Sequence, residues 1–479
     1  MVSAVSLEER LAAASVTALV RETLGAGDAW IVGGAVRDAA LGREVTDLDL
    51  AVAGDPRAAA EAIASAGAGH AFELSAEFET WRSTAHDGRW QVDVSALRGD
   101  SIEADLAARD FTIGAVAVPL AGGETLDPHR GLEDLREGVL RAVGDRSFAA
   151  DPLRLLRAAR LASELGLRIE PDTVSLARAE AERAGEPAAE RQLAELRLLL
   201  AGPAPPRGLE LMDELGITAA VLPELAALRG VEQNPNHHLD VHGHTITVLS
   251  RLLEVELDLE RFTGQRAPEV ASLLGAPLAN GWSRGAALRF GALVHDFGKP
   301  ATKAERDGFI TFFSHDREGA RIVREMCDRL RASRRLTDFL QRLTLHHLRL
   351  GFMVHERPLS RRRVHDYLRA TEPVGVEVTL LTVADRLAAR GTAPTASEEM
   401  VEGHLDLARE MIAAALDWRR EGPPAPLLRG DELAAELGLE AGPRIGELLR
   451  ELEAAQYAGE VTSREQALAV ARAAEPRSG

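Results

Sequence analysis

Apolar positions repeat with two different periods in the N-terminal part of the chain, which predicts a small mixed sheet with helices. Residues 7–24 carry apolar side chains at helical spacing and end at Gly25. Short apolar or alternating runs, typical of strands, occupy residues 30–32, 45–52, 70–75, 80–85 and 89–97. Asp87-Gly88 separates the last two runs and predicts a hairpin turn.

The best defined pattern is a strand, a glycine turn, a helix and a second strand. The first apolar run ends at Gly33 and Gly34, and the following helix is expected to begin at Val36. Free N–H groups beside such a turn suit a phosphate. In the second strand, Asp47 and Asp49 share one face because side chains two positions apart point the same way. Two carboxylates placed together in this way favour a bound cation such as Mg²⁺.

Composition limits the class of protein. The chain has 479 residues, of which 46% are hydrophobic and 4% aromatic, and this is typical of several mostly helical domains. The single cysteine, Cys327, excludes an internal disulfide. We expect a cytoplasmic protein, because there is no apolar run of membrane-spanning length and no signal-peptide pattern. The net charge of −19 argues against a generic nucleic-acid binder but allows a local basic groove.

The motif GGAVRD at residues 33–38, followed by DLD at residues 47–49, resembles the head domain of class II tRNA nucleotidyltransferases. This family comprises the CCA-adding enzymes and their bacterial poly(A) polymerase relatives. The resemblance implies that Gly33 and Gly34 cradle a nucleoside triphosphate and that Asp47 and Asp49 hold Mg²⁺. The 3′ hydroxyl of the RNA would attack the α-phosphorus, and pyrophosphate would leave.

Three further head residues have two interpretations each. Arg37 either binds phosphate or forms a structural pair with Asp38. Asp93 is either the third acid that the wider polymerase-like superfamily often places on such a strand, or the solvated face of an edge strand. Arg109, in the family-like stretch ARDFT, either holds a phosphate through two N–H groups or pairs with Asp110 or another nearby acid.

The stretch ADPLR at residues 150–154 resembles the family motif Glu-Asp-x-x-Arg, which reads the bases of CTP and ATP. Asp151 would accept a hydrogen bond from the amino group that cytosine and adenine share, and Arg154 would donate to the adjacent ring nitrogen. Guanine and uracil present the reverse pattern. Asp151 before a proline is also an ordinary helix N-cap. Arg157 either belongs to the nucleotide site or lies on a solvated helix face with acidic partners.

The chain departs from the family pattern in four places. Ala108 and Gly114 replace an arginine and an asparagine, and Ala150 replaces the glutamate of the base-reading motif. Only residues 98–103 separate the second hairpin strand from Asp105. Full CCA-adding enzymes usually carry a longer flexible loop there, linked to the switch from adding C to adding A. The short connection resembles that of CC-adding relatives.

A second group of chemical residues begins in the histidine-rich stretch after Gln233 and resembles an HD-type metal phosphohydrolase domain. The resemblance implies four metal ligands, namely His244, His295, Asp296 and Asp385. Imidazole and carboxylate ligands suit Mn, Ni, Fe or Mg ions. His315 and His346 would hold a second ion or a phosphate, and Lys299 would contact a phosphate.

We therefore predict a multidomain α+β protein. Its parts are a nucleotidyltransferase head (1–145), a helical neck and body (146–230), an α-helical HD domain (231–395) and a helical tail (396–479). The predicted function is template-independent addition of C, A or both, from CTP and ATP, to the tRNA 3′ end. Two alternatives stay open: an HD-type metal-dependent phosphohydrolase whose head only binds nucleotide or RNA, and a poly(A) polymerase.

Overall fold

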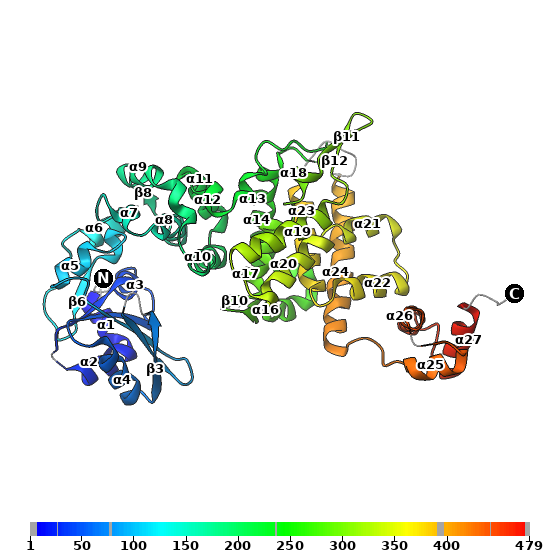
Figure 1. The fold of residues 1–479 in the computed structure, drawn as a ribbon, viewed down its shortest axis with the longest axis horizontal. Helices are drawn as coiled ribbons and strands as arrows, with labels where there is room; N and C mark the ends of the chain where they lie inside the picture. The colour runs from blue at the N-terminus through cyan, green and yellow to red at the C-terminus, as the bar shows by residue number, and fades with distance from the viewer. Residues whose placement is uncertain are drawn as a thin grey trace. The chain divides into compact units, whose positions relative to one another are not determined.

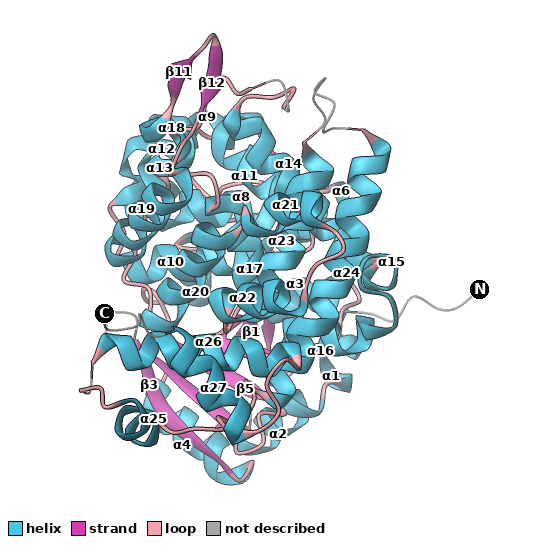
Figure 2. Cartoon of the chain, turned by 90° about the vertical axis from the view of Figure 1, so that its right-hand side faces the viewer, coloured by secondary structure: helices cyan, strands magenta, loops and turns pink. Residues whose placement is uncertain are grey.

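The computed structural model describes residues 7–25, 27–75, 79–234, 237–389, 397–440 and 442–474. The chain divides into two compact units, residues 1–221 and residues 222–479. Helices predominate, and the described strands form one six-stranded sheet and three two-stranded pairs (Figure 1; Figure 2). The predicted fold class, a mixed-sheet head followed by helical regions, is confirmed.

The head is organised around the six-stranded sheet, whose order is β3-β4-β5-β2-β1-β6. Neighbouring strands are antiparallel except β2 and β5, which run parallel. The strands are β1 (Ala29–Val32), β2 (Asp47–Val52), β3 (Gly69–Ser75), β4 (Thr80–Ala85), β5 (Gln91–Ala96) and β6 (Ala117–Pro119). The hairpin predicted at Asp87-Gly88 joins β4 to β5. Because β5 lies between β4 and β2, the interpretation of Asp93 as part of an edge strand is wrong.

The helices of the head are α1 (Leu7–Ala13), α2 (Ser15–Leu24), α3 (Gly33–Ala40), α4 (Pro56–Ala66), α5 (Ile102–Ala107) and α6 (Gly131–Glu137). The single helix predicted over residues 7–24 is two helices, because Ala14 adopts an extended conformation between them. Helix α3 begins at Gly33 rather than at Val36, directly after β1. Helix α4 begins at Pro56, where the Asp55 carboxylate accepts from the backbone N–H of Arg57.

The two faces of the sheet have different surroundings. One face buries Leu48, Leu50, Val92 and Val94 in the main core, together with residues of α2 and α4 (Figure 1). On the other face, Ala51 and Val32 pack with residues of α5 in a smaller cluster near β1 and β6. Asp47 and Asp49 belong to this second face, so the smaller cluster borders the predicted carboxylate site.

The remainder of the first unit is helical. It contains α7 (Ser147–Ala150), α8 (Leu153–Leu165), α9 (Pro171–Ala179), α10 (Ala189–Ala201), α11 (Pro205–Glu214) and α12 (Thr218–Val221). Two short strands, β7 (Val139–Leu140) and β8 (Arg168–Ile169), form a parallel pair before and after α8. Helix α8 carries Arg154 and Arg157 of the predicted nucleotide site.

The second unit contains the helices of the predicted HD domain and tail. They are α13 (Pro223–Ala226), α14 (Val241–Leu257), α15 (Leu259–Thr263), α16 (Ala267–Gly275), α17 (Arg284–Val294), α18 (Lys299–Thr302), α19 (His315–Arg329), α20 (Arg334–His346), α21 (Arg349–Met353), α22 (Arg361–Thr371), α23 (Gly375–Ala388), α24 (Glu398–Glu421), α25 (Gly430–Leu437), α26 (Pro443–Ala458) and α27 (Arg464–Ala474). Two small hairpins pair β9 (Pro277–Ala279) with β10 (Trp282–Ser283), and β11 (Ala304–Arg306) with β12 (Phe309–Thr311). None of the described helices combines the length and the apolar character needed to cross a bilayer.

Candidate functional site

Three carboxylates lie on one face of adjacent strands in the head. Asp49 of β2 stands directly opposite Asp93 of β5, and Asp47 lies two positions from Asp49. Burial raises the pKa of Asp49 and of Asp47 above the ordinary aspartate value, and the charge of Asp93 raises both further. A divalent cation at this face would relieve both effects, because it offsets the lost hydration and the mutual repulsion.

Arg82 accompanies the carboxylates from the neighbouring strand β4. It donates two hydrogen bonds of 2.7 Å to the two oxygens of Asp93, with which it is directly paired in register. Arg82 was not among the residues predicted for the site, although the sequence contained a signal for it. A two-residue turn at Asp87-Gly88 pairs residue 82 with residue 93, so the hairpin prediction already contained this ion pair.

Gly33 brings the backbone close to Asp49. Its φ is +67°, and a Cβ built there would lie 2.9 Å from Asp49 Oδ2 and 3.3 Å from Arg109 Nη1. The next residue, Gly34, donates its N–H to Asp49 Oδ2 over 3.1 Å. The predicted glycine turn therefore lies against the predicted metal-binding carboxylate, at the start of helix α3.

The two phosphate-binding candidates of the head form structural ion pairs. Arg37 donates two hydrogen bonds of 3.0 Å to Asp38. Arg109 donates to Asp105 over 2.9 and 2.8 Å, and not to Asp110. Both arginines nevertheless line a cavity of about 240 Å³ together with Gly33, Gly34, Asp49 and Asp93. The ion pairs therefore hold the guanidinium groups at the wall of this cavity.

A second cavity of about 510 Å³ contains the predicted base-reading residues. Asp151 accepts from Arg191 over 2.8 Å and caps α8 through the N–H of Leu153. Arg154 donates to the backbone carbonyls of Ala108 and Arg109 over 2.7 and 3.2 Å. Asp151 therefore accepts a hydrogen bond from the first turn of α8 and also lines the cavity.

The two cavities share four lining residues, namely Arg98, Arg109, Asp110 and Arg157. Arg157 donates to Asp110 over 2.9 Å and forms an ion pair of 3.3 Å with Glu195. Burial raises the pKa of Asp110, but the attraction and hydrogen bond of Arg157 outweigh this effect and leave it at about 2. A charged pair thus joins the carboxylate site to the base-reading cavity. Arg157 thus has acidic partners and also lines the cavity, and its membership of the nucleotide site stays a prediction.

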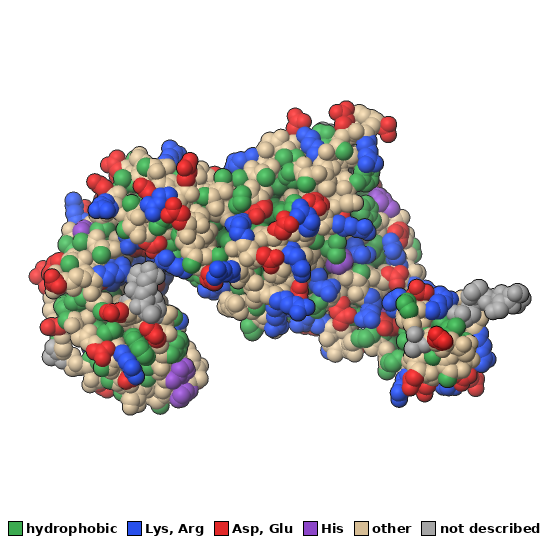
Figure 3. Space-filling model, viewed as in Figure 1, with side chains coloured by type: hydrophobic (Ala, Val, Ile, Leu, Met, Phe, Trp, Pro, Cys, Tyr) green, Lys and Arg blue, Asp and Glu red, His purple; other side chains and the backbone are tan. Residues whose placement is uncertain are grey.

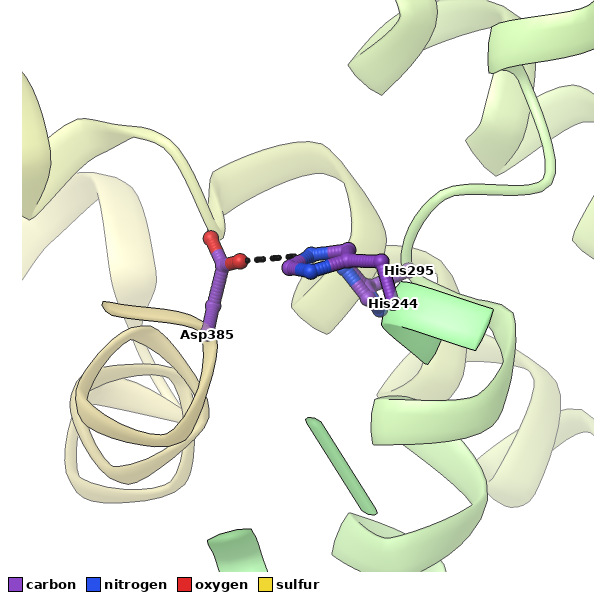
Figure 4. A group of neighbouring side chains, drawn as sticks. All are labelled: His244, His295 and Asp385. Atoms are coloured by element: carbon purple, nitrogen blue, oxygen red, sulfur yellow. Dashed lines mark hydrogen bonds and ion pairs between the residues drawn. The ribbon is translucent and has the colours of Figure 1, made fainter. Parts of the chain in front are cut away.

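The second unit gathers the predicted HD ligands in its interior. His244 on α14 contacts Asp385 on α23 at 3.0 Å, and His295 lies beside them immediately after α17 (Figure 4). One ligand atom from each of His244, His295 and Asp385 lies within 4.8 Å of the others. The four predicted ligands therefore converge, since Asp296 Oδ2 lies 3.1 Å from His295 and 3.8 Å from His244.

A second group of possible ligands shares Asp296. Asp296 Oδ1 lies 3.5 Å from His315 and 3.8 Å from His347, and these three residues form the second metal-sized cluster. His346 has a different environment, because its Nδ1 accepts from Arg349 over 2.9 Å. The second cluster thus contains His347, and the prediction of His346 at this position is wrong. Lys299 lies 2.7 Å from Asp296 Oδ2, which places it at the predicted site.

Three of these histidines have the same orientation. Nδ1 of His295, His315 and His347 lies 2.8, 2.7 and 2.7 Å from the backbone carbonyl three residues earlier. A carbonyl only accepts, so Nδ1 carries a proton in each ring, and Nε2 is the atom that a neutral ring can offer to a metal. This arrangement is typical of metal-binding imidazoles. Burial, with the nearby His295 and His315, also lowers the pKa of His347 to about 3, which keeps its ring neutral at neutral pH.

Comparison with known proteins decides the family. Family models match residues 29–141 (poly A polymerase head domain), 166–228 (probable RNA and SrmB-binding site of polymerase A) and 242–390 (HD domain). An A-adding tRNA nucleotidyltransferase of Deinococcus radiodurans is 38% identical, over 94% of this chain and 96% of its own. The chain belongs to the class II tRNA nucleotidyltransferases. The predicted family is confirmed.

Other members of the nucleotidyltransferase family are also similar over most of their length. A CC-adding tRNA nucleotidyltransferase of Thermus thermophilus is 33% identical, over 92% of each chain. A solved CCA-adding enzyme in complex with CTP has the same fold, with a TM-score of 0.61 and 22% identity over 98% of this chain and 97% of its own. The relatives therefore differ in which nucleotides they add, while the fold is common.

Several residues of this nucleotidyltransferase site could not be found by matching the motifs. Three predicted site residues are held by partners from 4 to 40 positions away in the chain. The pairs are Arg109 with Asp105, Arg157 with Glu195, and Asp151 with Arg191. Of these, only Asp105 had a local signal, the i,i+4 spacing to Arg109 on a helical segment. The other pairs depend on how α8 and α10 pack.

Proposed function

We propose that this nucleotidyltransferase adds part of the CCA end of tRNA, either the two cytidines or the terminal adenosine, rather than the complete triplet. The observation that carries the proposal is the short connection between β5 and α5, residues 97–101. Arg98 closes it by donating its backbone N–H to Asp105 over 3.2 Å. A connection of this length contains no long flexible loop with which to change from CTP to ATP. An A-adding and a CC-adding enzyme are among the relatives of this chain.

The carboxylate face is the proposed catalytic centre. Asp47 and Asp49 would hold Mg²⁺, which when bound supplies activation of the RNA 3′ hydroxyl and neutralises charge on the triphosphate. The start of α3 at Gly33 would lie beside the triphosphate, where the Gly34 N–H holds Asp49 Oδ2 in place. Asp93 stays a candidate for a third acid, and its ion pair with Arg82 places a positive charge beside the metal-binding carboxylates.

The larger cavity is the proposed nucleotide-reading site. Asp151 accepts from the amino group of cytosine or adenine, and Arg154 donates to the ring nitrogen beside it. The backbone carbonyls that hold Arg154 and the Arg191 that holds Asp151 limit rotation of both side chains. Arg37, Arg109 and Arg157 contact the phosphates between this cavity and the carboxylates. Rigid placement of Asp151 and Arg154 matters for specificity. Guanine and uracil are rejected because they would leave the Asp151 carboxylate and the Arg154 guanidinium unpaired.

A second activity, hydrolysis of a phosphate ester, is proposed for the HD domain. The common orientation of His295, His315 and His347 favours it, because three Nε2 atoms directed at the site and the shared Asp296 suit two divalent ions. His244, Asp385 and His295 would hold the first ion, and His315 and His347 the second. Lys299 is positioned to contact the phosphate. The domain boundaries at residues 145, 230 and 395, and a cytoplasmic location, are part of the same proposal.

The experiment that tests the transferase proposal uses tRNA transcripts that end before the tail, after C and after CC. Purified protein receives labelled CTP and ATP, separately and together, with Mg²⁺, and the Asp47→Ala, Asp49→Ala variant serves as the inactive control. Addition that stops at CC, or that occurs only on the CC end, supports the proposal. Formation of the full CCA end overturns it, as does a homopolymer of unlimited length, which identifies a poly(A) polymerase. No incorporation on any end would leave the HD phosphohydrolase as the function.

A further inference from the structure

The carboxylate face of the head sheet continues beyond the catalytic centre to its outer strand. The strand register places Asp49, Asp93, Arg82 and Phe72 in one row across β2, β5, β4 and β3. Directly paired residues of adjacent strands project to the same face. Phe72 therefore lies on the same face as the carboxylates, three strands away, which corresponds to roughly 14 Å at about 4.8 Å a strand.

Aromatic rings form the outer end of this row. Phe72 is 41% exposed, although a phenylalanine on a sheet face is usually covered. The exposed His70 lies two positions earlier on the same face, with its ring nearly parallel to that of Phe72 at 5.8 Å between centroids. His86, after β4, lies nearly parallel to His70 at 5.6 Å. Figure 3 shows histidine side chains together on the surface of the head near this strand.

The proposed nucleotide-reading cavity lies on one side of the carboxylates only. The cavity with Asp151 and Arg154 adjoins the carboxylates on the side of Arg109. In an in-line displacement the attacking oxygen lies opposite the leaving pyrophosphate. An RNA 3′ end that attacks from the side opposite this cavity would reach Asp49 across β5 and β4. A few extended nucleotides cover the distance from there to Phe72.

We propose that Phe72 and His70, extended by His86, are a stacking platform for the last single-stranded nucleotides of the tRNA acceptor end. The proposal rests on the transferase function and identifies where its RNA substrate is held. Stacking suits this substrate because every base has a flat apolar face, so ring contacts hold the end without reading its sequence. Arg82, between the platform and Asp93, adds a guanidinium group beside the path of the backbone.

The variant that tests the platform combines His70→Ala with Phe72→Ala. Because both side chains are exposed, we expect the thermal unfolding midpoint to stay close to that of the unmodified protein. The matched control is Phe309→Ala, which removes a phenylalanine that is 62% exposed on β12 of the second unit. Initial rates are measured over a range of RNA concentrations and, separately, of nucleotide concentrations, on the RNA end that the unmodified protein extends.

We expect the KM for RNA to rise about tenfold in the double variant, as for the loss of a base–aromatic stack. The KM for the nucleotide should change less than twofold, and Phe72→Trp should keep the KM for RNA low. A 2-aminopurine near the RNA 3′ end should be quenched on binding to the unmodified protein and to Phe309→Ala, but not to the double variant. An unchanged KM for RNA together with unchanged quenching would overturn the platform.

Two results separate this inference from the function on which it rests. If the unmodified protein extends no RNA end, the transferase proposal fails, and the 2-aminopurine titration still tests the platform alone. If light scattering shows that the unmodified protein is a dimer and the double variant a monomer, the exposed rings of β3 bind a second copy of the chain. That outcome would overturn the assignment to RNA.

Discussion

The head and the HD domain offer two acidic metal sites that differ in how the protein balances their charge. In the head, Asp47, Asp49 and Asp93 lie beside one another on neighbouring strands, and burial and repulsion raise the pKa of the first two. In the HD domain, burial raises the pKa of Asp296, but His295 and Lys299 outweigh it and hold the pKa well below its ordinary value. Burial likewise raises the pKa of Asp385, but the hydrogen bond from His244, together with the charges of His244 and His295, outweighs it and lowers this pKa.

This difference bears on when each site binds its ion. The head carboxylates gain charge compensation chiefly from a cation, which suits ions that arrive with a nucleoside triphosphate. In the HD domain, Lys299 and several histidines lie beside Asp296 in the folded chain before any ion binds. We propose that the HD groups are arranged in advance of the ion, and that the head site is completed by an ion that arrives with the substrate.

Removing a carboxylate from the head should have the largest effect. Asp49→Ala should lower kcat/KM for nucleotide incorporation by roughly 10³ to 10⁴, since a catalytic metal supplies several kcal/mol of transition-state stabilisation. The ions bound by the HD domain should be retained. Incorporation is measured with labelled nucleotide, and bound metal by elemental analysis. A variant that still incorporates nucleotide at more than a tenth of the normal rate would contradict the catalytic assignment.

The shared carboxylate of the HD domain should have the next largest effect. In an Asp49→Ala background, Mn²⁺ titration should give two tight sites. His347→Ala should lose one site, and Asp296→Ala should weaken both by at least about 100-fold, beyond the usual cost of an outer-shell change. His346→Ala is the matched control and should keep two sites, because His346 bonds to Arg349 instead. One tight site in the parent protein would refute the bridging role of Asp296.

A smaller effect is expected in the base-reading cavity. Asp151→Asn replaces an acceptor with an amide that both donates and accepts, so it should reduce the preference for the favoured nucleotide over GTP and UTP by about 10- to 100-fold. Competition assays with the four nucleotides measure this ratio. Glu186→Gln, at the rim of the same cavity, is the control. If both variants keep the original preference, Asp151 is only a helix cap.

The sequence predicted those parts of the two sites that depend on local periodicity. A two-residue period placed Asp47 and Asp49 on one face of a strand, which β2 confirms. The helix after the glycine turn was predicted to begin too late, because a glycine with positive φ can leave a strand and enter a helix in one residue. Local patterns thus identified the elements but not their exact junction.

Contacts between distant elements were not accessible from the sequence. His346 and His347 are adjacent at the end of α20, and only the packing of this helix decides which of them reaches Asp296. The ion pair between Arg191 and Asp151 likewise joins residues 40 positions apart. The exposed ring of Phe72 gave no signal either, because alternation alone does not say which face of an outer strand is left uncovered.

The smallest expected effect concerns the turn beside the head carboxylates. Gly33→Ala should lower the free energy of unfolding by roughly 1 to 3 kcal/mol, since its φ of +67° disfavours a side chain. It should also reduce incorporation, because the new Cβ would displace Asp49 Oδ2, 2.9 Å away. Gly34→Ala is the matched control: its Cβ would lie 3.5 Å from the same oxygen, an ordinary contact. Chemical denaturation and incorporation rates measure both variants. If both variants retain the normal stability and incorporation rate, the head tolerates movement of Asp49 Oδ2.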